Sequence, residues 1–160
     1  MTSRRLLEEL VAFVREAVAD YAFPAPDGES RDVQVFLHGL PEGEGDTTYP
    51  FVLVRWVEGH INSEPDHKTV LHDTVALVLG VYSPTSQEEA GLLTAELLDC
   101  LRRALWKQRL LARMFELEEP LRCAIPQPGQ RWHEYHMATI ETVWNYVWPP
   151  KGLAECNNLE

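Results

Sequence analysis

The sequence has few of the residues that mark disulfide scaffolds, redox sites or phosphate sites. Its three cysteines, Cys100, Cys123 and Cys156, form no Cys-x-x-Cys pair, which is typical of separate thiols in a reducing cytosol. The chain also has no Gly-x-Gly-x-x-Gly sequence, no Walker loop and no Gly-x-Ser-x-Gly elbow. The sequence therefore offers no catalytic residue and no cofactor-binding residue, and we expect a protein that is not an enzyme.

Basic residues are also scarce. The chain has 14 Lys and Arg against 25 Asp and Glu, which gives a formal net charge of −11. Proteins that read DNA sequence or bind anionic membranes need clustered Lys and Arg, so we expect no specific nucleic-acid binding and no membrane binding. No apolar run approaches the roughly 18 residues of a membrane span. Acidic residues interrupt the apolar runs of the N-terminus, so we expect no signal peptide and a cytoplasmic protein.

A histidine-rich loop is the main place where a metal site could be sought. Its histidines and carboxylates lack the regular spacing of a zinc or calcium loop. Two further histidines, His133 and His136, are three residues apart on a predicted strand, where an odd separation puts them on opposite faces. We therefore expect no metal site, although a small-ligand or enzyme site in this loop stays open as an alternative. The residues of the loop are His60, Glu64, Asp66, His67, His72 and Asp73.

The segment from Thr69 to Trp106 predicts one long strand that leads into one long helix. The strand, Val70 to Tyr82, is rich in β-branched and aromatic residues and has no proline. Its odd-numbered positions from Leu71 to Val81 are the more apolar set and should face a helix layer, whereas the other face is smaller and mixed. Two overlapping capping boxes, Thr85 with Glu88 and Ser86 with Glu89, predict where the helix begins.

The rest of the chain predicts further elements around this unit. The order is helix, strand, strand, strand, helix, strand, which predicts an α+β fold: a mainly antiparallel sheet of four or more strands with two helices packed on one face. Residues 1–150 form a single domain in this interpretation, and residues 151–160 form a C-terminal tail whose last two residues come from cloning. The expected elements are a helix at 3–21, strands at 32–37, 51–59 and 132–148, and a short edge element at 114–117.

Apolar side chains remain once the two helices are docked on the sheet. Leu92 and Trp106 point about 100° and 140° away from the sheet-facing side of their helix. A single sheet covered by two helices cannot hide apolar groups on both faces, so another subunit should cover some of them. For Trp144 an ordinary place in the core is an equally good interpretation. The predicted oligomer or partner interface comprises Leu92, Trp106, Trp144, Tyr146 and Trp148.

Three stretches resemble a known family, the small tail proteins of long-tailed phages and prophages. They are YPFVLVRWVEG at 49–59, the strand and helix at 70–105 with GVYSPTSQEEAGLLTAELLDCLRRAL, and FELEEPLRCAIPQPGQRWHEYHMATIETVWNYVWPP at 115–150. The likeness spans residues 49–150, about two-thirds of the chain, and departs from the family's pattern at Cys123, where an aromatic residue is expected. Such proteins are similar to tail terminators, which form a ring, commonly a hexamer, that caps the tail tube and joins it to the head.

The resemblance implies a structural protein that has no catalytic residue and no cofactor. Its partners would be other copies of itself, the tail tube and head-completion proteins, first in the cytoplasm of the bacterial host and then in the virion. An acidic surface can line a DNA conduit without trapping the DNA, because like charges repel. A dimeric adaptor that binds a partner through the tryptophan-rich strand is a further alternative. The acidic residues expected to face the lumen or the tail tube are Glu42, Glu44, Asp46, Glu64 and Asp66.

Overall fold

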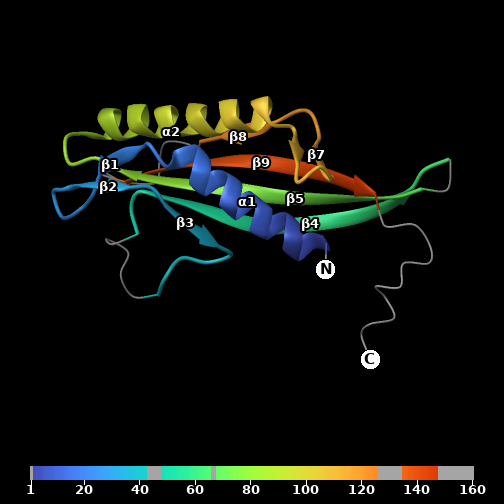
Figure 1. Cartoon of the computed structure of the whole chain (residues 1–160). Coiled ribbons are helices and arrows are strands. Elements are labelled where there is room, and N and C mark those ends of the chain that lie inside the picture. The colour runs from blue at the N-terminus through green and yellow to red at the C-terminus, as the bar shows by residue number, and fades with distance from the viewer. Residues whose placement is uncertain (1, 43–47, 66–67, 126–134, 148–160) are drawn as a thin grey trace.

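The structure is a computed structural model that describes residues 2–42, 48–65, 68–125 and 135–147. It contains two helices and a curled, mostly antiparallel sheet of several strands, which confirms the α+β class (Figure 1). The main sheet has the strand order β3-β4-β5-β9-β7-β6, with β8 also paired to β9. The elements are α1 (Thr2–Val18), β1 (Ala22–Pro24), β2 (Ser30–Asp32), β3 (Gln34–Leu37), β4 (Phe51–Ser63), β5 (Thr69–Tyr82), α2 (Gln87–Lys107), β6 (Leu110–Leu111), β7 (Phe115–Leu117), β8 (Arg122–Ala124) and β9 (Tyr135–Val147).

Strand β5 lies at the centre of the sheet. It pairs antiparallel with β4 on one side and with β9 on the other along most of its length. Leu77 lies opposite Val54 on β4 and opposite Ile140 on β9. Because side chains alternate across a strand, this register gathers the odd positions of β5 and the even positions of β9 on one face of the sheet.

The two faces of β5 differ as the sequence predicts. The six odd-numbered side chains from Leu71 to Val81 are all buried, which confirms that this is the core face. The other face is mixed, with half-buried Val70 and Val78 beside buried Ala76. The buried side chains on the core face are Leu71, Asp73, Val75, Leu77, Leu79 and Val81.

Helix α2 begins at the predicted capping box. The Ser86 hydroxyl accepts a hydrogen bond from the Glu89 backbone N–H at 3.1 Å, which satisfies one of the free donors in the first turn. Apolar residues at helical spacing then turn one side of the helix toward the sheet, where the helix contacts β5 and β9. The buried residues of α2 are Ala90, Thr94, Leu97, Leu98, Leu101 and Leu105.

Helix α1 ends at Val18, three residues earlier than the sequence predicts. Its side chains Leu6, Leu10 and Val14 have no exposed surface and belong to the same apolar core as α2 and the sheet. The helix contacts α2, β3 and β4, and Figure 1 shows it crossing the sheet obliquely, whereas α2 runs along β9. Burial of these leucines and valines contributes roughly 1.5–3 kcal/mol for each side chain.

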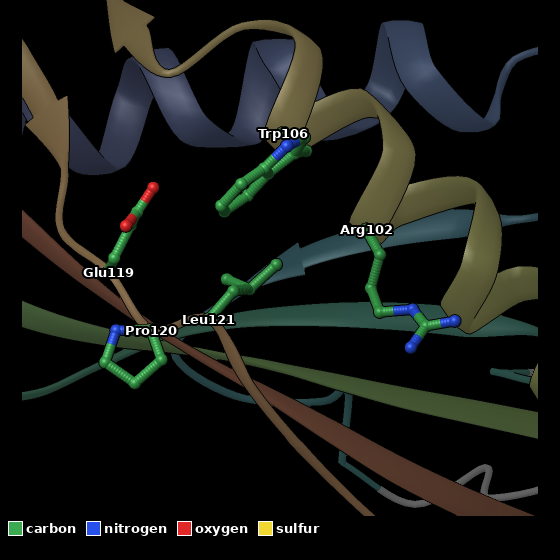
Figure 2. Close-up of a pocket in the computed structure, with 5 residues that line it drawn as sticks. All are labelled: Arg102, Trp106, Glu119, Pro120 and Leu121. Atoms are coloured by element: carbon green, nitrogen blue, oxygen red, sulfur yellow. The ribbon is translucent and has the colours of Figure 1, made fainter.

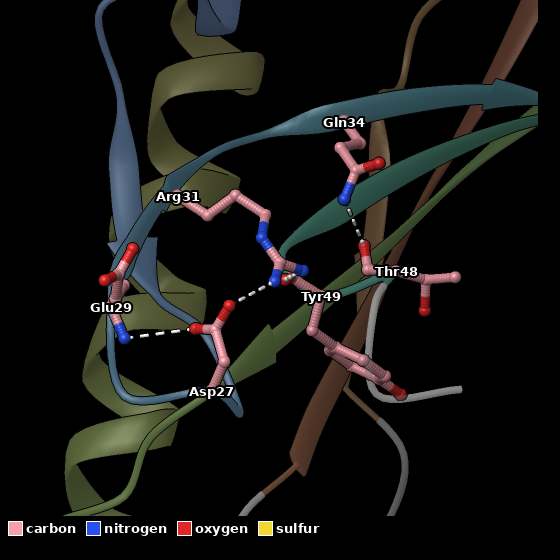
Figure 3. Close-up of polar contacts among 6 residues, drawn as sticks. All are labelled: Asp27, Glu29, Arg31, Gln34, Thr48 and Tyr49. Carbon is pink, nitrogen blue, oxygen red and sulfur yellow. Dashed lines mark hydrogen bonds and ion pairs between the residues drawn. The ribbon is translucent and has the colours of Figure 1, made fainter. Parts of the chain in front are cut away.

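A small two-stranded sheet, β1 with β2, follows α1 and was not predicted from the sequence. Arg31 connects it to the start of β4, because its guanidinium donates to the Asp27 carboxylate at 2.8 Å and to the Tyr49 carbonyl at 3.1 Å (Figure 3). The Asp27 carboxylate also accepts the Glu29 N–H, and these contacts lower the pKa of Asp27. The pairing fixes the chain just before β3 enters the main sheet.

Strand β4 is longer than predicted and forms one arm of a long hairpin with β5. It continues to Ser63 instead of ending near Gly59, and a bulge between Trp56 and Glu58 interrupts its pairing with β5. Every residue from Arg55 to Ser63 is exposed, so this half of the strand adds little to the core.

Among the described residues, no helix is long and apolar enough to cross a bilayer.

Two glycines allow a matched test of this packing. Gly80 lies opposite Phe51 in the β4–β5 ladder, and a Cβ at Gly80 would overlap the buried Phe51 ring. Gly91 lies in α2, and a Cβ there would be 3.7 Å from the His136 ring, which is an ordinary contact distance. We expect Gly80→Ala to lower the free energy of unfolding by about 1–3 kcal/mol. Gly91→Ala should raise it by up to about 1 kcal/mol.

Urea denaturation of the two variants and the wild type measures both effects. Opposite signs of the two changes are the expected result. Equal stabilities of Gly80→Ala and the wild type would show that Phe51 moves aside without cost and that its contact with Gly80 is not tight in solution.

Candidate assembly surface

Two large apolar side chains of α2 lie on the surface, as the helical wheel predicts. Leu92 is 61% exposed and Trp106 is 51% exposed. They are 14 residues apart, which corresponds to about 21 Å along the helix and about 40° around it. Both therefore project from the same outward side of α2, one near each end. Their role in contacting another chain stays a prediction.

The charges around these two side chains differ in sign. Glu88 and Glu96 are exposed within one turn of Leu92, and Glu89 is half-exposed beside them. Around Trp106 the exposed charged residues of the helix are Arg102, Arg103 and Lys107. Asp99, between the two ends, pairs with Arg102 at 3.1 Å and with Arg103 at 2.6 Å. The outward side of α2 is thus acidic at its start and basic at its end.

A hollow of about 400 Å³ lies beside Trp106 (Figure 2). Trp106 and Arg102 come from α2, whereas Glu119, Pro120 and Leu121 come from the loop between β7 and β8. Figure 2 shows the indole ring and the Leu121 side chain pointing toward one another across this space. The walls are therefore mainly apolar, with a cation and a carboxylate at the sides.

Arg109 holds the Trp106 ring in place. Its guanidinium lies 4.4 Å from the centre of the indole ring and also forms an ion pair with Glu119. A cation over an exposed indole contributes about 0.5–1 kcal/mol. Arg109 thus covers one face of the indole ring and pairs with the carboxylate at the edge of the hollow.

The structure corrects the expectation for Trp144 and Tyr146. Their exposed fractions are 0% and 3%, because the antiparallel register places the even positions of β9 on the core face. The Trp144 indole N–H donates to the Thr142 hydroxyl at 2.9 Å, and the Tyr146 ring packs edge-on against Phe115 at 5.1 Å. These two residues belong to the core and offer no surface to a partner. Trp148 lies outside the described residues.

A buried polar cluster on the core face was not recognised from the sequence. The Asp73 carboxylate, 5% exposed, accepts hydrogen bonds from the Tyr146 hydroxyl at 2.7 Å and from the Ser3 hydroxyl at 3.1 Å. A side chain at Gly59 would collide with the same carboxylate, so glycine is needed there. Burial and the neighbouring Asp73 raise the pKa of Tyr146 to about 12. The cluster joins α1 to the sheet, and its polar side chains form hydrogen bonds with one another.

The predicted acidic residues are only partly described. Glu42 follows β3 and Glu64 follows β4, and both are exposed. Glu44, Asp46 and Asp66 lie outside the described residues. Both described carboxylates therefore lie on the surface, and their role stays a prediction.

The histidine-rich loop brings two of its histidines together. His60 and His72 are opposite each other in the β4–β5 ladder, and their rings stack 4.6 Å apart. His72 Nδ1 lies 3.4 Å from a Glu118 carboxylate oxygen, and among the described residues its Nε2 has no hydrogen-bond partner. No three His, Cys, Asp or Glu residues in the described part of the chain are placed to hold a metal ion. His67 lies outside that part.

Tyr146→Phe tests the buried Asp73 cluster. Loss of the hydroxyl leaves Asp73 with one donor fewer, and we expect the free energy of unfolding to fall by about 1–3 kcal/mol. The folded protein keeps the phenolic proton to pH about 12, whereas the unfolded chain loses it from pH 10.0. The folded state therefore binds more protons in this interval, and the contribution of Tyr146 to stability is lost as the pH rises.

Chemical denaturation of wild type and variant between pH 8 and pH 11 measures this difference. The difference in the free energy of unfolding between wild type and variant should become smaller as the pH rises above 10.0. A gap that stays constant, or a variant as stable as the wild type at pH 8, would contradict the described hydrogen bond.

Comparison of the sequence with known proteins identifies no relative of this chain. No protein-family model matches the chain, and no curated protein sequence matches it. The resemblance to phage tail proteins therefore stays a prediction based on the residues that carry it. The outward side of α2 has three features: two exposed apolar side chains, a hollow beside one of them, and charges of opposite sign around the two side chains.

Proposed function

We propose that this protein is a structural component of a phage or prophage tail, of the tail terminator or head–tail joining type. In this proposal it acts by self-assembly into a ring on the tail tube and carries out no catalysis. Its partners are further copies of the chain, the tail tube and head-completion proteins. The assembled protein belongs to the virion after synthesis in the bacterial cytoplasm.

The observation that carries the proposal is the pair of exposed apolar side chains on α2, Leu92 and Trp106. A ring needs two different patches on each subunit, because head-to-tail contacts close only when one patch meets the other. Leu92 and Trp106 lie at separate ends of one helix and have surroundings of opposite charge. This arrangement supports contact between two different surfaces of identical copies.

The proposal also includes the finer expectation that both helices pack on one face of the sheet. Contacts between α1 and α2, and the single apolar core that they share with the odd positions of β5, support this arrangement. The opposite face carries half-buried apolar side chains such as Leu53, Val78 and Val143. Such a wedge, with a helical side and a sheet side, suits packing around an axis.

The acidic surface supports a conduit for DNA. A net charge of −11 on each copy repels the phosphate backbone, so a lumen lined with carboxylates would let DNA pass without adhesion. Exposed Glu42 and Glu64 are the described candidates for that lining or for the side that meets the tail tube. An oligomer structure in which both residues lie on the outer wall would contradict this part of the proposal.

The mass of the purified protein in solution tests self-assembly. A six-membered ring would have about six times the chain mass of 18.3 kDa, near 110 kDa. We expect light scattering over a wide range of concentration to give such a mass, and electron microscopy to show annular particles. A mass of 18.3 kDa at every concentration would contradict self-assembly by this chain.

Trp106→Ala separates assembly from folding. Trp106 is 51% exposed, so its loss should lower the stability of the monomer by only about 1 kcal/mol, through the Arg109 contact. The loss of an aromatic anchor from an interface typically costs about 2 kcal/mol or more in association. We expect a dissociation constant at least about tenfold higher by light scattering. An unchanged oligomer mass at all concentrations would count against a role for Trp106.

A further inference from the structure

The two ends of α2 form a knob and a hollow on the same chain. Leu92 projects from the first half of the helix with 61% of its surface exposed. The hollow beside Trp106, at the other end, has a volume of about 400 Å³ and apolar walls from Trp106, Pro120 and Leu121. A leucine side chain is small enough for this space, and insertion there would remove apolar surface of both partners from water.

The surrounding charges agree with this pairing. Exposed Glu88 and Glu96 lie one turn before and one turn after Leu92 on the helix. Arg102 lines the hollow, and exposed Lys107 follows Trp106 in the sequence. Two copies that each carry a net charge of −11 repel at a distance, so a stable contact needs local charges of opposite sign. The basic end of α2 supplies them, and it does so at the hollow.

The hollow also has the features of an interface anchor site. Trp and Arg are the side chains most often found where truncation costs the most binding energy. Here Arg109 stacks on the Trp106 ring and pairs with Glu119. A contact that restrains the aromatic wall before a partner arrives reduces the entropy lost on association.

We propose that Leu92 of one copy enters the hollow beside Trp106 of the next copy, with Glu88 and Glu96 facing Arg102 and Lys107. This inference rests on the proposed self-assembly and names the contact that makes it. In this proposal each copy uses the knob toward one neighbour and the hollow toward the other. Contacts of this kind continue from copy to copy and form a ring when the rotation between neighbours closes.

A complementation experiment with two variants tests this contact. Leu92→Asp places a carboxylate where the knob must enter an apolar hollow, and Trp106→Glu removes the aromatic wall and repels the acidic end of the next copy. Both positions are more than half exposed, so the thermal unfolding of each monomer should stay close to that of the wild type. Each variant alone should be monomeric under conditions in which the wild type forms rings.

The mixture of the two variants gives the decisive result. The intact hollow of Leu92→Asp can accept the intact knob of Trp106→Glu, after which neither free end can continue. We therefore expect a heterodimer of about twice 18.3 kDa and nothing larger in light scattering. Ile61→Asp is the matched control, because Ile61 is also 61% exposed but lies on β4, and it should keep the mass of the wild type.

The possible failures are distinguishable. Rings of wild-type mass from either variant, or a mixture that stays monomeric while the wild type forms rings, would overturn this contact and leave the proposed ring intact. A wild-type chain that stays monomeric, or that forms only a closed dimer through two-fold pairing of α2, would overturn both the head-to-tail contact and the proposed function.

Discussion

The antiparallel pairing of β5 with both of its neighbours determines most of this structure. Val54, Leu77 and Ile140 lie side by side on three adjacent strands, and this alignment places the apolar positions of all three on one face. A slip of one residue in either ladder would turn a whole set of side chains to the opposite face. Side chains of both helices belong to the same hydrophobic cluster as the side chains on this face. Helix α2 contacts β5 and β9, so this register also determines which side of α2 faces outward.

Local features of the sequence predict the central unit well. The β-branched run at 70–82 and the capping box at Ser86 locate β5 and the start of α2 to within a residue. Three-residue strands such as β1, β2 and β8 give no such signal, because their pairing depends on partners that are distant in sequence. The last four residues of β4, 60–63, were missed for a related reason. Its polar residues are held in a strand by β5 and not by burial.

The candidate surface shows the same division. Helical periodicity alone places Leu92 and Trp106 on the outward side of α2, and the structure agrees. The assignment of Trp144 and Tyr146 failed because alternation along one strand tells which residues share a face, but not which face is covered. Only the register with β5 shows that these side chains belong to the core. Likewise, Pro120 and Leu121 complete the hollow through tertiary contacts that no local pattern announces.

The central claim is that copies of this chain cover the outward side of α2 for one another. A cryo-electron microscopy map of the wild-type particle tests it most directly, because helices and tryptophan side chains can be located in such a map. The account predicts a closed ring in which Trp106 lies at every boundary between neighbouring subunits. Particles in which the outward side of α2 faces solvent on every subunit would contradict it.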